Sequence, residues 1–182
     1  GNARLRDVIN KQITDEEIVT TARQALTSGV KGVKLYFMIG LPTETGSDVD
    51  AVIQLVKKIK HQFLRSSRAR KKIGHITVSL NSFVPKPFTP FQWSAMDEVG
   101  VLKTKIKKIK NELKKVANLR INSDVPRWAY IQALLSRGDR KVADILSLAH
   151  ASRGNWAQTL KTVAVNPDFY VYRERRTDER FP

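Results

Sequence analysis

The chain has 182 residues, no cysteine, and a formal net charge of +16 that comes from 33 basic and 17 acidic side chains. This length is sufficient for one full hydrophobic core, or for one domain with a smaller companion. The lack of cysteine excludes disulfides, zinc–thiolate sites and any iron–sulfur cluster whose ligands come from this chain alone.

The positive charge is compatible with binding to nucleic acid or to another acidic surface, and equally with a basic surface that is only solvated. The first residues show no signal-peptide pattern, and no apolar run approaches the ~20 residues of a membrane span. We therefore expect a soluble, cytoplasmic protein that has no membrane partner.

The N-terminal part of the chain predicts a helix followed by a parallel strand. Thr14 and Glu17 have the spacing of a capping box, and Gly29 is placed to end the helix that they begin. Residues 33–39 form an apolar run, which is typical of a buried parallel strand. Ligands bind at the carboxyl ends of such strands, so residues 40–45 are expected to border a small-molecule site.

A second helix and a second strand follow. The helix is expected to begin at Ser47 as its N-cap and to close in a basic, loop-like stretch at residues 65–72. Residues 75–83 are β-branched and alternate in polarity, which predicts a strand. Three prolines within residues 85–90 exclude a helix or a central strand there, so residues 84–93 are expected to form an extended loop. The order of elements favours right-handed βαβ units, with one more strand expected near or before residue 1.

After residue 93 the pattern becomes helical. One apolar stripe, formed by Leu102, Ile106, Ile109, Leu113 and Val116, predicts a helix whose other side chains are almost all lysine. That lysine face could hold an RNA backbone, or it could be only solvated, and the pattern leaves both interpretations open. A short edge strand is expected at residues 119–122. Three further helices are expected from the segments that begin at 123, 141 and 155.

Two segments together resemble radical SAM enzymes: Lys34-Leu-Tyr-Phe-Met-Ile-Gly-Leu-Pro-Thr-Glu-Thr45 and Asn81-Ser-Phe-Val-Pro-Lys-Pro-Phe-Thr-Pro-Phe-Gln-Trp93. The chain looks most similar to the large proteins of this class that carry an N-terminal cobalamin-binding-like domain and are related to tRNA methylthiotransferases. Residues 135–140 and 172–176 resemble the same group. The resemblance covers essentially the whole chain.

The resemblance implies an α/β fold. Residues 1–95 would form the second half of a partial (β/α)6 radical SAM barrel with parallel strands, and residues 96–182 an α-rich C-terminal domain. The implied cofactors are S-adenosylmethionine and a 4Fe–4S cluster whose Cys-x3-Cys-x2-Cys ligands would lie upstream of this chain, with cobalamin as a further cofactor of the whole protein. The implied activity is that of an iron–sulfur oxidoreductase, which cleaves S-adenosylmethionine reductively to a 5′-deoxyadenosyl radical. The chain alone is expected to be inactive.

The resemblance also implies contacts with S-adenosylmethionine, at positions that match motifs of the family. These are Asn10 and Lys11 for its carboxylate, Met38, Gly40, Leu41 and Pro42 for its adenine, and Phe83 and Lys86 in the loop that closes over it. Alternatively, Lys11 is an exposed lysine without a ligand, and the aromatic side chains of the loop only seal the barrel. Tyr36 replaces the first glycine of the usual pattern, which favours a buried position for its side chain. The resemblance assigns no catalytic residue and no metal ligand to this chain.

The competing hypothesis is a basic RNA-binding module without catalytic activity of its own. The substrate and the oligomeric state have no signal in the sequence.

Overall fold

The computed structural model describes residues 1–68 and 74–179, which form two compact units. The sheet unit contains residues 1–82 and 100–124, and the helical unit contains residues 83–99 and the chain from residue 125 onward. The units therefore interleave along the chain, whereas the sequence predicts a single boundary near residue 95.

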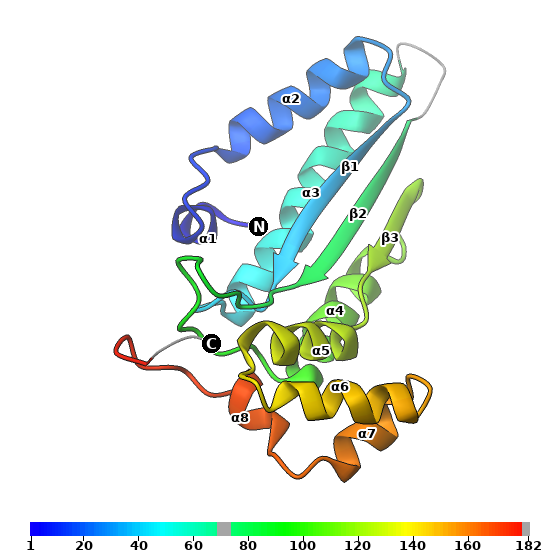
Figure 1. The fold of residues 1–182 in the computed structure, drawn as a ribbon. Coiled ribbons are helices and arrows are strands. Elements are labelled where there is room, and N and C mark those ends of the chain that lie inside the picture. Colours follow the sequence, from blue (N-terminus) through cyan, green and yellow to red (C-terminus); the bar gives the residue numbers. More distant parts are fainter. Residues whose placement is uncertain (69–73, 180–182) are drawn as a thin grey trace. The chain divides into compact units, whose positions relative to one another are not determined.

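The sheet unit contains three parallel strands in the order β1-β2-β3, joined by helices (Figure 1). Its elements are α1 (Ala3–Val8), α2 (Asp15–Thr27), β1 (Gly32–Ile39), α3 (Gly46–Arg68), β2 (His75–Ser82), α4 (Val99–Leu113) and β3 (Leu119–Ser123). The register pairs Lys34 with Thr77, and Thr77 with Arg120. The α/β class and the parallel strands are confirmed, and the described sheet has three strands.

Local sequence signals account for most of these boundaries. Thr14 caps α2 as predicted, because its hydroxyl accepts the Glu17 amide while the Glu17 carboxylate accepts the Thr14 amide. Gly29 follows the helix with φ of +92°, a conformation that glycine adopts without strain. Helix α3 begins at Gly46, so the prediction that Ser47 caps it is wrong. Residues 65–68 are helical and not loop-like, and residues 69–73 of the same predicted stretch lie outside the described residues.

One face of the sheet forms the core of this unit. Ile76, Val78 and Leu80 of β2 are fully buried, and α3 and α4 supply apolar side chains from that side. The lysine-rich helix α4 therefore packs in the sheet unit with four of the five predicted stripe residues inward, whereas Val116 lies beyond the end of the helix and is half-buried. The two helices contribute apolar side chains to this core, which include Val52, Val56, Ile59, Phe63, Leu102, Ile106, Ile109 and Leu113.

Strand β1 is not buried on both faces, contrary to the prediction from its apolar run. Its residues alternate, with Lys34, Tyr36 and Met38 exposed and the residues between them more buried. Tyr36 is 69% exposed, so its predicted buried position is wrong. The physical reason is that β1 lies at the edge of the described sheet, and that only one sheet face is covered by α3 and α4.

The described part of the helical unit contains four helices and the irregular segment 83–98, which has no helix and no strand, as its prolines predict. The helices are α5 (Pro126–Arg137), α6 (Val142–Ala151), α7 (Trp156–Thr162) and α8 (Pro167–Val171). Their interior includes Ala133, Leu134, Ile145 and Val171. Main-chain bonds from Met96 to Val171 and from Arg175 to Trp93 tie the irregular segment to the end of the unit. None of the described helices is long and apolar enough to cross a membrane.

The fully buried Arg137 joins three parts of the helical unit. Its guanidinium donates to the carbonyl oxygens of Ser94 at 2.7 Å, Arg173 at 2.8 Å and Val171 at 3.2 Å. Burial, together with the nearby Arg175 and Arg173, lowers the pKa of Arg137 to about 10, so the side chain remains charged at neutral pH. Arg137 therefore joins the main chain of the irregular segment at Ser94 to the main chain at the end of α8 and just after it.

Candidate functional site

The loop after β1 turns tightly at Gly40. This residue is buried and has φ of +82°, and its N–H group donates to Oε1 of Glu44 at 2.9 Å. The Glu44 amide in turn donates to the Leu41 carbonyl at 2.9 Å, and Thr43 also has a positive φ of 68°. A side chain at Gly40 would be strained in this conformation, so the glycine is required by the turn itself.

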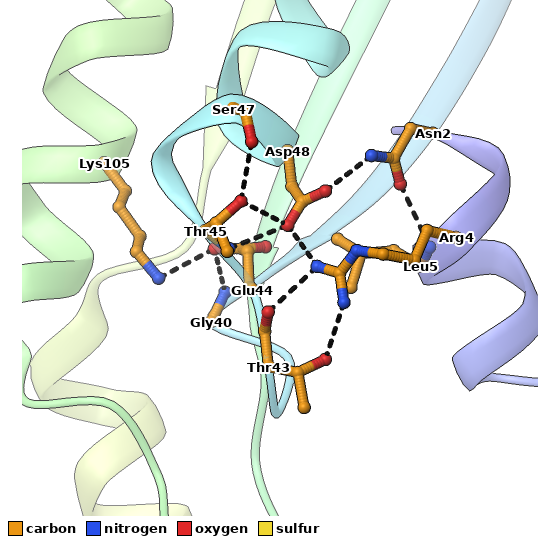
Figure 2. Close-up of polar contacts among 10 residues, drawn as sticks. All are labelled: Asn2, Arg4, Leu5, Gly40, Thr43, Glu44, Thr45, Ser47, Asp48 and Lys105. Carbon is orange, nitrogen blue, oxygen red and sulfur yellow. Dashed lines mark hydrogen bonds and ion pairs between the residues drawn. The ribbon is translucent and has the colours of Figure 1, made fainter.

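The Glu44 side chain fixes this loop against helix α4 (Figure 2). Its carboxylate is only 2% exposed and lies 2.9 Å from Nζ of Lys105, which is itself largely buried. The carboxylate thus accepts from a main-chain amide and from a buried ammonium group, which satisfies a charge that would otherwise be costly to bury. Glu44 therefore supports the loop after β1.

Asp48 is the second buried carboxylate of the loop (Figure 2). It accepts hydrogen bonds from the Thr45 amide at 2.7 Å, from the Thr45 hydroxyl at 2.8 Å, and from the side chains of Asn2 and Arg4. Burial opposes ionisation, but the donors from Thr45, Arg4 and Asn2 outweigh it and hold the pKa of Asp48 below its ordinary value. The carboxylate is therefore charged at neutral pH and organises the groups around it.

Helix α1 is held beside the loop by the same network. Arg4 also donates to the carbonyl oxygen of Thr43 at 2.9 Å and to its hydroxyl at 3.0 Å. Asn2 caps the helix, because its side-chain oxygen accepts the Leu5 amide at 3.0 Å. Residues 2–4, about thirty positions before β1, are thus bound directly to the loop that follows β1.

A cavity of about 190 Å³ lies between this N-terminal segment and β1. Three of the predicted ligand residues line it: Lys11, Met38 and Leu41. Most of the other lining side chains are apolar, and they include Leu5, Ile9, Ile13, Ile18, Phe37 and Leu55. The structure therefore brings together one cation and two apolar residues that the resemblance assigns to the same ligand.

The other predicted residues have different places. Gly40 and Pro42 flank Leu41 but do not line the cavity, and Asn10 is an exposed residue with φ of 53°. Phe83 and Lys86 belong to the helical unit. In that unit the Phe83 ring packs edge-on against Phe91 with centroids 5.7 Å apart, and Lys86 is exposed.

Two polar residues that line the cavity, Arg6 and Tyr36, were not predicted as site residues from the sequence. Arg6 is buried and binds the Ile13 carbonyl at 2.6 Å and the Asp15 carboxylate at 2.7 Å, so it holds the turn between α1 and α2. No local pattern distinguishes Arg6 from the neighbouring basic residues. The signal for Tyr36 was the alternation of Lys34, Tyr36 and Met38 on one strand face, which the apolar composition of the run obscured.

Together the fold and this loop define a parallel α/β unit with a cavity of about 190 Å³ beside the carboxyl end of a strand, where ligands bind in open α/β sheets. The chain is 36% identical over 146 residues to an uncharacterized protein of Methanocaldococcus jannaschii, and the match covers 80% of this chain. The chain spans about 30% of the length of that relative. No family model and no solved structure matches the chain.

Proposed function

We propose that this chain is the second half of the barrel of a radical SAM enzyme, followed by an α-rich region, and that it supplies part of the site for S-adenosylmethionine. The observation that carries the proposal is the cavity shared by Lys11, Met38 and Leu41, next to a strand that ends just before Gly40. The motif around Gly40 and the lysine at position 11 lie far apart in sequence, and the fold places them at one cavity.

The free edge of β1 also supports a barrel. β1 pairs only with β2 among the described strands, so its other edge is unpaired. A second cavity, of about 290 Å³, separates this strand from α2 and is lined by Ala22 and Ala25 on the helix and by Val33 and Leu35 on the strand. An unpaired edge beside an apolar space suits one more parallel strand, which would extend the sheet toward a (β/α)6 barrel.

The residues at the cavity fit the chemistry of S-adenosylmethionine. Apolar walls near Met38 and Leu41 suit a planar adenine ring, and the Lys11 ammonium group suits a carboxylate. When bound to a reduced 4Fe–4S cluster, S-adenosylmethionine supplies a 5′-deoxyadenosyl radical. The role of this chain would be to hold the two ends of the molecule and to exclude water. It has no cysteine, so the cluster would be held by other parts of the whole protein.

The test is the affinity for S-adenosylmethionine of the whole, anaerobically reconstituted protein. Lys11→Gln removes a charge-assisted contact and is expected to weaken binding roughly tenfold, as measured by equilibrium dialysis. Lys103→Gln is the matched control, because Lys103 is an exposed lysine of α4 that does not line the cavity. Equal affinity of the Lys11→Gln and Lys103→Gln proteins would contradict the assignment of Lys11.

A second candidate function is RNA binding, and helix α4 favours it. Lys108 pairs with Asp50 at 2.6 Å, and Lys110 donates to Ser123. Four other lysines are exposed and form no ion pair with a described carboxylate. They are Lys103 and Lys107 in α4, and Lys114 and Lys115 directly after it. Such a lysine group suits the phosphate backbone of RNA.

RNA binding through this group should depend steeply on salt. The logarithm of the affinity for RNA is expected to fall linearly with the logarithm of the salt concentration, because each phosphate contact releases a counterion. Replacing Lys103 and Lys107 together with glutamine should reduce the slope by about 2, in filter-binding titrations at several salt concentrations. A slope that the double replacement leaves unchanged would exclude this surface.

A further inference from the structure

The face of the sheet opposite α3 and α4 is polar and accessible. It is formed by alternate residues of the three strands, whose side chains point away from the buried core. In Figure 1 the strands β1 and β2 are drawn in front of α3, and no helix of the sheet unit crosses in front of them. The residues of this open face, all exposed or half-buried, are Lys34, Tyr36, Met38, His75, Thr77, Ser79, Asn81, Arg120 and Asn122.

Parallel sheets are normally covered on both faces, and their strands are then apolar on both. The open face of this sheet carries hydroxyl, amide and basic groups instead. It is therefore unsuited to packing against an apolar layer, and suited to a polar ligand or to water. In the proposed half-barrel this face would line the interior, where the substrate is bound.

The charges on the open face have one sign. It carries Lys34 and Arg120 and no aspartate or glutamate. Lys34 lies over the Tyr36 ring, with its Nζ 4.7 Å from the ring centroid, and neither Lys34 nor Arg120 forms an ion pair with a described carboxylate. Two cations on an exposed face without acidic partners favour an anionic ligand.

The strand register aligns these cations in one row. Lys34 of β1 pairs with Thr77 of β2, and Thr77 pairs with Arg120 of β3. Neighbouring strands lie about 4.8 Å apart, so the backbones of Lys34 and Arg120 lie about 10 Å apart, with the backbone of Thr77 between them. Lysine and arginine side chains are long enough to reach one anion above Thr77. The row lies about 13 Å along the strand from Met38, at roughly 3.3 Å per residue.

We propose that Lys34, Thr77 and Arg120 form a recognition site for an anionic group of the substrate, a phosphate or a carboxylate. The proposal rests on the proposed function for its place inside a barrel, and it adds the class of the substrate. The substrate would extend along the open face from the end near Met38 to the basic row. The Arg120 guanidinium can donate two parallel hydrogen bonds to such a group, and Lys34 adds a point charge.

The experiment titrates the whole protein with inorganic phosphate and, separately, with acetate, by calorimetry or by chemical-shift changes. At least one of the two anions is expected to bind saturably. The anion that binds with the higher affinity shows whether the site prefers a phosphate or a carboxylate group. Arg120→Gln and Lys34→Gln are each expected to weaken that binding at least fivefold, because each removes one charged contact. Lys115→Gln is the matched control, since it removes an exposed lysine outside the open face and is expected to have no effect.

Two results would overturn the inference. The first is that neither anion binds saturably, and the second is that the Arg120→Gln protein binds the anion with the same affinity as the unchanged protein. The same preparations are tested for S-adenosylmethionine binding, so that the two proposals fail separately. If S-adenosylmethionine binds and no anion does, only the anion site is wrong. If the anion binds through Arg120 and S-adenosylmethionine does not bind, the anion site stands and the radical SAM proposal is wrong.

Discussion

Replacing Asp48 with alanine is expected to lower the free energy of unfolding of the sheet unit by about 2–3 kcal/mol, because the donors of Thr45 and Asn2 lose their charged acceptor. The carboxylate accepts from Thr45, Asn2 and Arg4, and its loss leaves Arg4 without its buried partner. The measurement is chemical denaturation followed by circular dichroism. Because the loop and α1 depend on this network, the cavity beside Lys11 should be lost as well.

Asp50→Ala is the matched control for this prediction. Asp50 is two residues further along the same helix and pairs with Lys108, but both side chains are about half exposed. Exposed pairs of this kind contribute under about 1 kcal/mol, so Asp50→Ala should be nearly neutral. A cost for Asp48→Ala no larger than that for Asp50→Ala would show that the buried network does not stabilise the fold.

Asp48 should also make the stability depend on acid pH. Its pKa is lower in the folded protein than in the unfolded chain, where it is about 3.9. Its stabilising contribution is therefore complete well above pH 4, and it is lost as the pH falls below 4 toward the folded pKa. The Asp48→Asn protein should lose less stability over that pH range than the unchanged protein.

Replacing Arg137 with methionine is expected to destabilise the helical unit by about 3 kcal/mol or more. Methionine fills similar space, but the carbonyl groups of Ser94 and Arg173 lose their side-chain donor, and each buried acceptor without a partner costs about 1–3 kcal/mol. The Val171 carbonyl loses the same donor but keeps the Met96 amide. Thermal or chemical denaturation measures the loss. Arg140→Met, three residues further on at an exposed position, should change the stability by less than about 0.5 kcal/mol. A protein with Arg137→Met that is as stable as the unchanged protein would contradict the structural role of this arginine.

Local patterns were sufficient to predict the elements that hold the site. The capping box at Thr14, the glycines at 29 and 40, and the β-branched run at residues 75–82 each describe a boundary or an element that the structure contains. These signals depend on neighbours in sequence, so they are visible without a fold. They also predicted the parallel pairing of β1 and β2, since a helix connects the two strands.

Contacts between distant residues could not be predicted in this way. The pairs Arg4–Asp48 and Lys105–Glu44 join residues more than forty positions apart, and nothing local distinguishes these side chains from their charged neighbours. The exposure of Tyr36 was predicted wrongly for a related reason. An apolar run indicates burial on both faces only where both faces are covered, and coverage is a property of the whole fold.

The most direct test of the account is whether the whole protein, reconstituted anaerobically with iron and sulfide, binds S-adenosylmethionine and releases 5′-deoxyadenosine on reduction. We expect stoichiometric binding that Lys11→Gln weakens, and 5′-deoxyadenosine in the products. A reconstituted protein that takes up no cluster and does not bind S-adenosylmethionine would contradict the central claim.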